Sequence, residues 1–260
     1  MDTSVQAVSA QDQEAIEWQA RVDLAAAHRI AVMHDLAEGI MNHFTLVVPG
    51  KPDRYLHMPF GLHWAEVTAS CFMEVSLEDG RILKGDGRIQ RSAYCIHAPI
   101  HRLAPHAKCV LHTHMPYASA LTRLKDPRIK LIGQTEIGVA RDAVYDMHFD
   151  GPVRDVEEGE RLARVLGDKN ILFMANHGVL VTGRTVAEAY DRLYYLERAA
   201  QVQMYAMWTN QELLDCTEEA VTRTARIYSE NVITGSKSTW DLHFEALKRI
   251  IDRNGSDYRN

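Results

Sequence analysis

Apolar side chains recur at helical spacing near the start of the chain and at strand spacing after it. Between residues 14 and 41 they fall every three or four positions, which predicts one or two amphipathic helices. Residues 44–48 form a short β-branched and aromatic run that ends at the turn-forming residues 49–53, which predicts a strand. Residues 72–77 and 81–84 flank a second turn and predict a hairpin.

Helices and strands continue to alternate in the rest of the chain. We expect a helix over 92–103, a strand over 109–114, and a hairpin of strands 171–175 and 178–183. Asp155–Glu158 and Thr185–Glu188 are typical of capping boxes, so they predict two helix starts; Gly167 is a natural end for the first helix, and the second extends to about Trp208. Because this alternation is not a strict strand–helix–strand repeat, we expect an α/β sandwich with helices on both faces of a mostly antiparallel sheet.

The chain reads as one domain with two flanking segments. The sequence contains no internal repeat, low-complexity tract or Gly/Ser linker. We expect a helical extension over 1–23, a main domain over 24–210, and a helical tail over 211–260 that packs on the domain or on a neighbouring subunit.

Charge and cysteine usage narrow the function classes. The 29 basic and 35 acidic residues give a net charge of -6, which offers no cationic surface to nucleic acid or anionic lipid. The four cysteines are widely spaced without a C-x-x-C pair, as expected in a reducing compartment. The first 17 residues resemble no signal or transit peptide, and no apolar run is long enough to span a membrane. A cytoplasmic protein with a small-molecule substrate is the expectation.

Two histidine motifs carry candidate chemistry. His112 and His114 lie two apart on a predicted strand, so both rings project from the same face, about 7 Å apart at the backbone, and can converge on one metal ion. His177 follows a predicted buried strand within Asn176-His177-Gly178 and is well placed to point into a cleft. Two unconnected histidines and a turn histidine are the plain alternatives.

Three neutral imidazoles leave the full charge of a bound dication available to a substrate. Such a metal polarises a carbonyl or stabilises an enediolate, and the same ligand set also holds iron for oxygen chemistry. Ligand types alone do not choose between these reactions. Phosphate-loop, dinucleotide-binding, nucleophile-elbow and H-E-x-x-H motifs are absent.

The combination of motifs resembles the class II aldolase/adducin family. Cys109–His114 is followed, 63 residues after His114, by Asn176-His177-Gly178-Val179, then by Gly183 and a capped helix. Residues 59–62 and 66–70 resemble the adducin-like bacterial branch. The resemblance implies a three-layer α/β/α sandwich, a zinc, manganese or similar dication on His112, His114 and His177, and a homotetramer with active sites between subunits.

Departures from the family pattern bear on the substrate. The catalytic glutamate of the sugar-phosphate aldolases falls, by residue count, at Ala93, and the phosphate loop is degraded at 42–47, where the arginine is missing. A phosphate loop without its cation holds a dianion poorly, so we expect a substrate without phosphate. Decarboxylation is compatible with the lost carboxylate, because departure of carbon dioxide needs no prior proton abstraction.

Several further residues are candidates for the site. Tyr117, three residues after His114, is the preferred proton donor, and Glu136 is a second candidate for catalysis. Expected substrate contacts are His43, Phe60, Gly61, Arg91 and Ser92, with Arg91 suited to a substrate carboxylate. Phe44, Phe60 and Trp64 suggest an aromatic substrate, although Trp64 fits a hydrophobic core equally well.

Three hypotheses follow from the sequence. The first is a metal-dependent decarboxylase or aldolase that acts on a small, non-phosphorylated, hydroxylated carboxylate, with zinc as the expected metal and manganese or iron as alternatives. The second is an iron(II) oxygenase on the same scaffold. The third is a non-catalytic binding protein like the adducins; the retention of all three metal-binding histidines argues against it.

Overall fold

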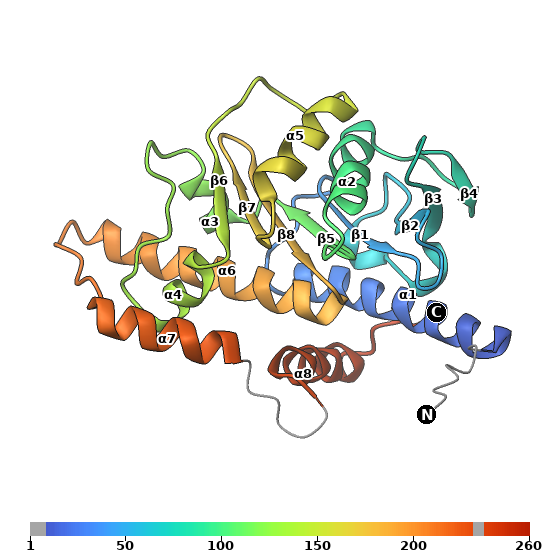
Figure 1. Cartoon of the computed structure of the whole chain (residues 1–260). Helices are drawn as coiled ribbons and strands as arrows, with labels where there is room; N and C mark the ends of the chain where they lie inside the picture. The colour runs from blue at the N-terminus through green and yellow to red at the C-terminus, as the bar shows by residue number, and fades with distance from the viewer. Residues whose placement is uncertain (1–8, 231–236) are drawn as a thin grey trace, which may run out of the picture.

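The chain folds around a single eight-stranded sheet, shown in the computed structural model of Figure 1, which describes residues 9–230 and 237–260. The strand order is β4-β3-β2-β1-β5-β8-β7-β6, and every neighbouring pair is antiparallel except the parallel pair β6 and β7. The strands are β1 (His43–Val47), β2 (Arg54–His57), β3 (Met73–Ser76), β4 (Ile82–Lys84), β5 (Cys109–Thr113), β6 (Ala143–Asp146), β7 (Ile171–Met174) and β8 (Gly178–Gly183).

Helices cover both faces of this sheet (Figure 1). The face above the sheet in the figure carries α2 and α5, which pack on each other, and the opposite face carries α1 and α6, with α8 packed on both. The helices are α1 (Ala10–Met33), α2 (Arg91–Leu103), α3 (Pro116–Leu121), α4 (Gln134–Ala140), α5 (Val156–Leu166), α6 (Val186–Trp208), α7 (Glu218–Glu230) and α8 (Thr239–Arg253), with short 3-10 helices η1 (Trp64–Glu66) and η2 (Ala69–Cys71). The expected three-layer α/β/α sandwich is confirmed.

The period-two alternation of the strands creates two cores. On β5, Cys109 and Leu111 pack in the core beneath α1 and α6, whereas Val110 packs in the core beneath α2 and α5. The same alternation on β1 sends Phe44 and Leu46 to the α1 side. His43, Thr45 and His112 therefore share the α2 face, and this placement brings them near one another.

The predicted elements match the structure except at a few boundaries and short segments. The helical pattern continues to residue 41 in the sequence, but α1 ends at Met33, because Asp35 and Gly39 both adopt a positive φ of 57°. Both predicted N-caps are present, because the side chains of Asp155 and Thr185 accept from the backbone N–H groups of Glu158 and Glu188. The return bond of a capping box is missing in both, since Glu158 pairs with Arg161 and Glu188 accepts from the backbone N–H of Arg184. Strands β2 and β6 and helices α3 and α4 were not predicted, because each has at most seven residues and offers little periodicity.

The flanking segments of the sequence prediction contain the start of α1 and, in the tail, α7 and α8, whereas residues 211–217 and 254–260 are not helical. Helix α1 runs through residues 23 and 24 without interruption, and α8 packs on α1 and α6. Backbone bonds from Ala69 to Tyr258 and from Ser70 to Asn260 hold the end of the chain against the domain. The predicted extension and tail include 1–8 and 231–236, which lie outside the described residues, and the division into three segments stays a prediction. No helix among the described residues combines the length and hydrophobicity needed to span a membrane.

Buried histidines make the fold sensitive to acid. His28 is fully buried among Phe44, Trp64 and Phe72, and its Nδ1 lies 2.8 Å from the carbonyl oxygen of Leu24. Burial is the largest cause of its lowered pKa, about 3, and burial also lowers the pKa of His57 and His101 to about 4.

We expect the free energy of unfolding to fall steeply with acid below pH 6.5. The folded-state pKa values lie below the ordinary value of 6.5, so the stabilisation is complete above pH 6.5 and is lost as the pH falls towards 4, because only the unfolded chain binds the protons. Each such histidine contributes a slope of up to about 1.4 kcal/mol per pH unit. Urea unfolding at a series of pH values measures this slope. His28→Gln should reduce it, the same change at the exposed His148 should not, and equal slopes in both variants would contradict the assignment.

Candidate metal centre

Three histidine side chains converge at one end of β5. His112 lies on β5, His114 follows directly after it, and His177 occupies the turn between β7 and β8. One ring nitrogen from each lies within 4.8 Å of the others, and the ring centroids are 4.8–5.0 Å apart. We call these three residues the histidine triad. The structure brings all three predicted metal ligands together, in an arrangement that can hold a metal ion.

The β7–β8 turn approaches β5 closely because its residues permit it. Asn176 adopts a positive φ of 53°, a conformation that asparagine tolerates better than most residues. A Cβ atom on Gly178 would lie 2.6 Å from Cδ2 of His114 and 2.6 Å from the carbonyl oxygen of Thr113. Glycine at 178 therefore lets His177 reach the other two rings.

Hydrogen bonds to Nδ1 orient two of the rings. His112 Nδ1 lies 2.9 Å from the carbonyl oxygen of Val179, and His114 Nδ1 lies 2.5 Å from Oε2 of Glu38. Both acceptors hold the ring proton on Nδ1 and leave Nε2 with a free electron pair. Nε2 of His114 is buried and has no hydrogen-bond partner in the described part of the chain. A metal ion would satisfy this atom, so the donor set fits a dication.

Two of the three rings, those of His112 and His177, are uncharged at neutral pH. Burial is the largest cause that lowers the pKa of His112 well below its usual value, followed by the nearby His177 and His43. Burial also lowers the pKa of His177 to about 4, together with the nearby His114 and Arg123. Neutral imidazoles are the form that binds metal.

His43, an expected substrate contact, lies beside the triad. It is paired with His112 across β1 and β5, and the two ring centroids are 5.0 Å apart. Its side chain is buried, and its Nδ1 bonds to Nε2 of His97 at 2.8 Å. The structure therefore places His43 next to His112, and its role as a substrate contact stays a prediction.

The two expected catalytic residues have other partners. The hydroxyl of Tyr117 lies 2.6 Å from that of Tyr205 on α6, and the backbone N–H of Tyr117 donates to Glu197 at 2.8 Å. Glu136 is buried on α4, which packs on α6 and α7. Among the described contacts none joins either side chain to the triad, so their catalytic roles stay predictions.

Of the other expected substrate contacts, Arg91 and Ser92 lie in the first turn of α2, and Phe60 and Gly61 lie in the loop between β2 and η1. Arg91 Nε donates to the carbonyl oxygen of Arg154 at 3.3 Å, and Ser92 sits in the first turn of the same helix. The backbone N–H of Phe60 donates to the carbonyl oxygen of Arg88 at 2.8 Å, and Gly61 has a positive φ of 111°. No described contact brings these four residues to the triad, and their roles also stay predictions.

Sequence reasoning missed several polar neighbours of the triad. Glu38 orients His114 through the bond to Nδ1. Oδ1 of Asn42 accepts from the backbone N–H of His114 at 3.1 Å, and Nδ2 of Asn42 is buried without a partner among the described residues. His97 and His101 lie four apart on α2, opposite His43 and Thr45, which lie two apart on β1. A spacing of four on a helix and a spacing of two on a strand each place two side chains on one face, and these spacings were the signal in the sequence that could have predicted the cluster.

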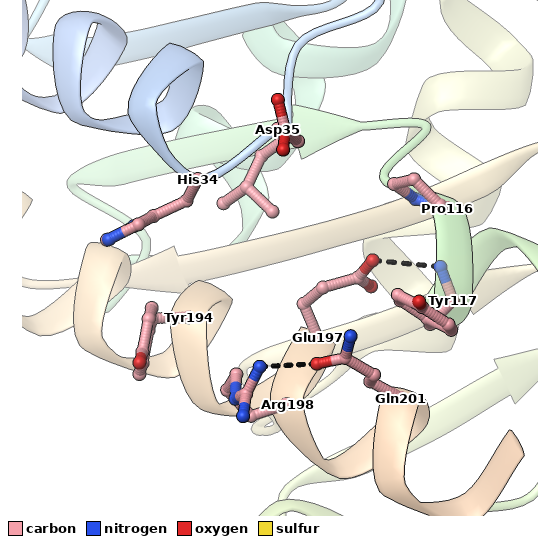
Figure 2. A pocket seen from close by; sticks show the side chains of 9 residues that line it. His34, Asp35, Pro116, Tyr117, Tyr194, Glu197, Arg198 and Gln201 are labelled. Carbon is pink, nitrogen blue, oxygen red and sulfur yellow. Dashed lines mark hydrogen bonds between the residues drawn. The ribbon is translucent and has the colours of Figure 1, made fainter. Parts of the chain in front are cut away.

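Figure 2 shows a cavity of about 450 Å³ that is lined by segments adjoining Glu38 and His114 in the sequence. Its walls come from the end of α1 and the loop after it, from the start of α3, and from α6; they are His34, Asp35, Leu36, Pro116, Tyr117, Tyr194, Glu197, Arg198 and Gln201. Two of these segments run directly into the triad region, at Glu38 and at His114. Burial is the largest cause that raises the pKa of Glu197, whose carboxylate accepts from the backbone N–H groups of Tyr117 and Ala118.

Comparison with known proteins agrees with this architecture. The model of the family described as "Class II Aldolase and Adducin N-terminal domain" matches residues 22–204. A solved aldolase II superfamily protein from Pseudomonas syringae is 33% identical, with a TM-score of 0.87 over 97% of this chain and 98% of that one.

The relatives include proteins named as aldolases and proteins named as adducins. A Caulobacter vibrioides protein named after the class 2 aldolases is 31% identical over 93% of this chain and 92% of its own length. Alpha-adducin from Rattus norvegicus is 29% identical over 92% of this chain, which spans only 34% of the adducin.

Proposed function

Because this chain belongs to the class II aldolase and adducin family, we propose that it is a metal-dependent carbon–carbon lyase, a decarboxylase or aldolase, whose metal is held by His112, His114 and His177. The observation that carries the proposal is the triad itself: three imidazoles with one ring nitrogen each within 4.8 Å of the others, and with Nε2 of His114 buried and unpartnered among the described residues. Zinc suits three imidazoles at an open site, and manganese and iron are alternatives.

The chain's own residues prepare the site for this chemistry. Val179 and Glu38 fix the orientation of His112 and His114, and Gly178 gives His177 its close approach. A dication bound there supplies a Lewis acid that stabilises the negative charge left on a carbonyl or enediolate oxygen. His43 lines one side of the site as a substrate contact.

The lost carboxylate favours decarboxylation over proton abstraction. Ala93, at the place of the family's catalytic glutamate, is fully buried on α2. The only carboxylate with a described contact to the triad is Glu38, which is already bonded to His114. Loss of carbon dioxide requires no base, whereas aldol cleavage requires one near the substrate hydroxyl.

The substrate is proposed to be a small hydroxylated carboxylate without phosphate. Phe44 lies in the degraded phosphate loop, and its ring is fully buried against Trp64 at 4.4 Å between centroids. Both rings pack in the core on the α1 side, away from His43. Phe44 and Trp64 therefore do not support an aromatic substrate, and of the three aromatic residues only Phe60 still does.

A homo-oligomer, a tetramer as the resemblance implies, is part of the same proposal. Helix α6 leaves large apolar side chains exposed, including Val202, Tyr205 and Trp208, which a neighbouring subunit would cover. Static light scattering of the purified chain tests this, and a monomer would contradict it.

Two other functions remain as rivals. Three histidines also suit an iron(II) oxygenase, and the similarity to alpha-adducin supports a binding protein without catalysis. The lyase reaction needs metal but no oxygen, the oxygenase needs both, and the binding protein turns over nothing.

A screen of hydroxylated carboxylates separates these functions. The chain, loaded in turn with zinc, manganese and ferrous iron, is assayed for carbon dioxide and carbonyl products in air and under nitrogen, with His112→Ala as the blank. We expect turnover that needs metal, persists under nitrogen and is absent in the blank. Turnover that stops under nitrogen would establish the oxygenase, and none under any condition would favour the binding protein.

A further inference from the structure

A chain of hydrogen bonds runs through the buried layer between β1 and α2. His43 Nδ1 lies 2.8 Å from His97 Nε2, and His97 Nδ1 lies 2.6 Å from Oγ1 of Thr45. The same oxygen lies 2.8 Å from His101 Nε2, and His101 Nδ1 lies 2.7 Å from the carbonyl oxygen of Ala107. All four side chains are at least 94% buried, with exposed fractions of 0–6%. We call His43, His97, Thr45 and His101 the histidine chain.

The carbonyl at one end sets the direction of every bond in the histidine chain. Because Ala107 O can only accept, His101 carries its proton on Nδ1, and its Nε2 accepts from the hydroxyl of Thr45. The hydroxyl has only one proton, so Thr45 Oγ1 accepts from Nδ1–H of His97. Nε2 of His97 is then bare and accepts from Nδ1–H of His43.

This direction requires neutral rings, and their burial provides them. Burial is the largest cause that lowers the pKa of His97 well below the usual value and that of His101 to about 4. His97 and His101 therefore each carry one proton at neutral pH, and the bare Nε2 of His97 places the proton of His43 on Nδ1.

Because Nδ1 of His43 donates to His97, Nε2 of His43 is left as a hydrogen-bond acceptor next to the triad. His57 repeats the arrangement: its Nδ1 bonds to the carbonyl oxygen of Met58 at 2.5 Å, so its Nε2 is also bare. That nitrogen is buried without a partner among the described residues, and the ring centroid lies 6.3 Å from that of His43. A buried acceptor without a donor is costly, so this side of the site suits a ligand that brings its own O–H groups.

We propose that the histidine chain holds His43 in its accepting tautomer and that His43 thereby selects a substrate hydroxyl beside the triad. The assignment rests on the proposed function, because the hydroxyl belongs to the lyase substrate. Thr45, His97 and His101 are positioning residues that act through His43. A carboxylate oxygen in the same place would bring its lone pair against that of His43 Nε2, and these repel. The substrate therefore places its hydroxyl group, and not its carboxylate, next to His43.

Nitrogen NMR of the metal-free chain with labelled histidine reads these tautomers directly at about pH 8, where a histidine of ordinary pKa is neutral. We expect His43, His97 and His101 each to carry the proton on Nδ1. Thr45→Val removes the hydroxyl that connects His97 and His101, so His43 should become a mixture of tautomers. Thr45→Ser should restore the single Nδ1-protonated tautomer of His43. A wild-type His43 protonated on Nε2 would overturn the proposal without any variant, and so would an unchanged His43 in a folded Thr45→Val chain.

Glycolate and its methyl ether, methoxyacetate, test the selection of a hydroxyl. Both are titrated calorimetrically into the zinc-loaded chain. Zinc itself favours glycolate, so the informative quantity is the ratio of the two affinities in each protein. We expect this ratio to fall about tenfold in Thr45→Val, the value of one hydrogen bond, and to recover in Thr45→Ser.

An unchanged ratio, or no measurable binding of either acid to the wild type, would overturn the hydroxyl assignment. Failure of the proposed function is a separate result, because a chain that takes up no zinc still reports its tautomers in the metal-free spectrum.

Discussion

Replacing His177 with alanine should remove the metal from the protein. Chain purified without chelators should carry close to one divalent metal per protomer, and His177→Ala should carry almost none, because two imidazoles are left to hold an ion that three surround. We expect the affinity to fall more than about 100-fold, beyond what loss of a hydrogen-bond partner of a ligand causes. Elemental mass spectrometry of both proteins, prepared side by side, measures the content.

Two variants calibrate this result. His148→Ala removes an exposed histidine that pairs with Asp150, and it should keep its metal. Glu38→Gln keeps the shape of the side chain but weakens the bond to His114, so it should bind metal about 10- to 100-fold more weakly. Equal metal content in the wild type and His177→Ala would refute the proposed ligand set, and iron as the native metal would move the oxygenase to first place.

Gly159→Ala should destabilise the fold strongly. Gly159 lies where α5 crosses α2, and an added Cβ would come 1.8 Å from the carbonyl oxygen of Cys95 and 2.9 Å from Cγ of Pro99. Pro99 has no N–H to bond this carbonyl within α2, and the resulting gap lets α5 pack closely. Because the methyl group meets backbone rather than a flexible side chain, the two helices must separate. We expect a loss of about 2–4 kcal/mol in the free energy of unfolding, despite the better helix propensity of alanine.

Urea unfolding followed by circular dichroism measures the loss. Glu157→Ala is the matched control, because it lies exposed on the same helix and should change the stability by less than about 0.5 kcal/mol. A Gly159→Ala chain within about 1 kcal/mol of the wild type would show that α2 and α5 adjust to the extra carbon without strain.

The parts of this structure that follow from local pattern could be predicted from the sequence. The long helices, the β3–β4 and β7–β8 hairpins and the N-caps at Asp155 and Thr185 depend on periodicity and on contacts within a few residues. His112 and His114 are neighbours by strand geometry alone. Their meeting with His177 is a long-range contact, and the family resemblance supplied it.

The polar surroundings of the triad could not be predicted, because they depend on which segments the sheet places side by side. Glu38 lies in a stretch whose apolar spacing still looks helical, and only the backbone turn at Asp35 and Gly39 brings its carboxylate to His114. His97 falls within the helix predicted over 92–103, but its partner His43 is 54 positions away. Tyr117 is close to His114 in the sequence, yet its hydroxyl bonds to Tyr205, 88 positions away.

We expect the bond between Glu38 and His114 to couple the cavity to the triad thermodynamically. Residues 34–36 line the cavity of Figure 2, and Glu38, two positions further, is anchored to one ring of the triad. Anything that strengthens the hold on His114 also lowers the conformational entropy of the 34–38 loop, and so of the cavity wall. By linkage, a ligand that orders this wall must raise metal affinity by the same factor by which metal raises the affinity of that ligand.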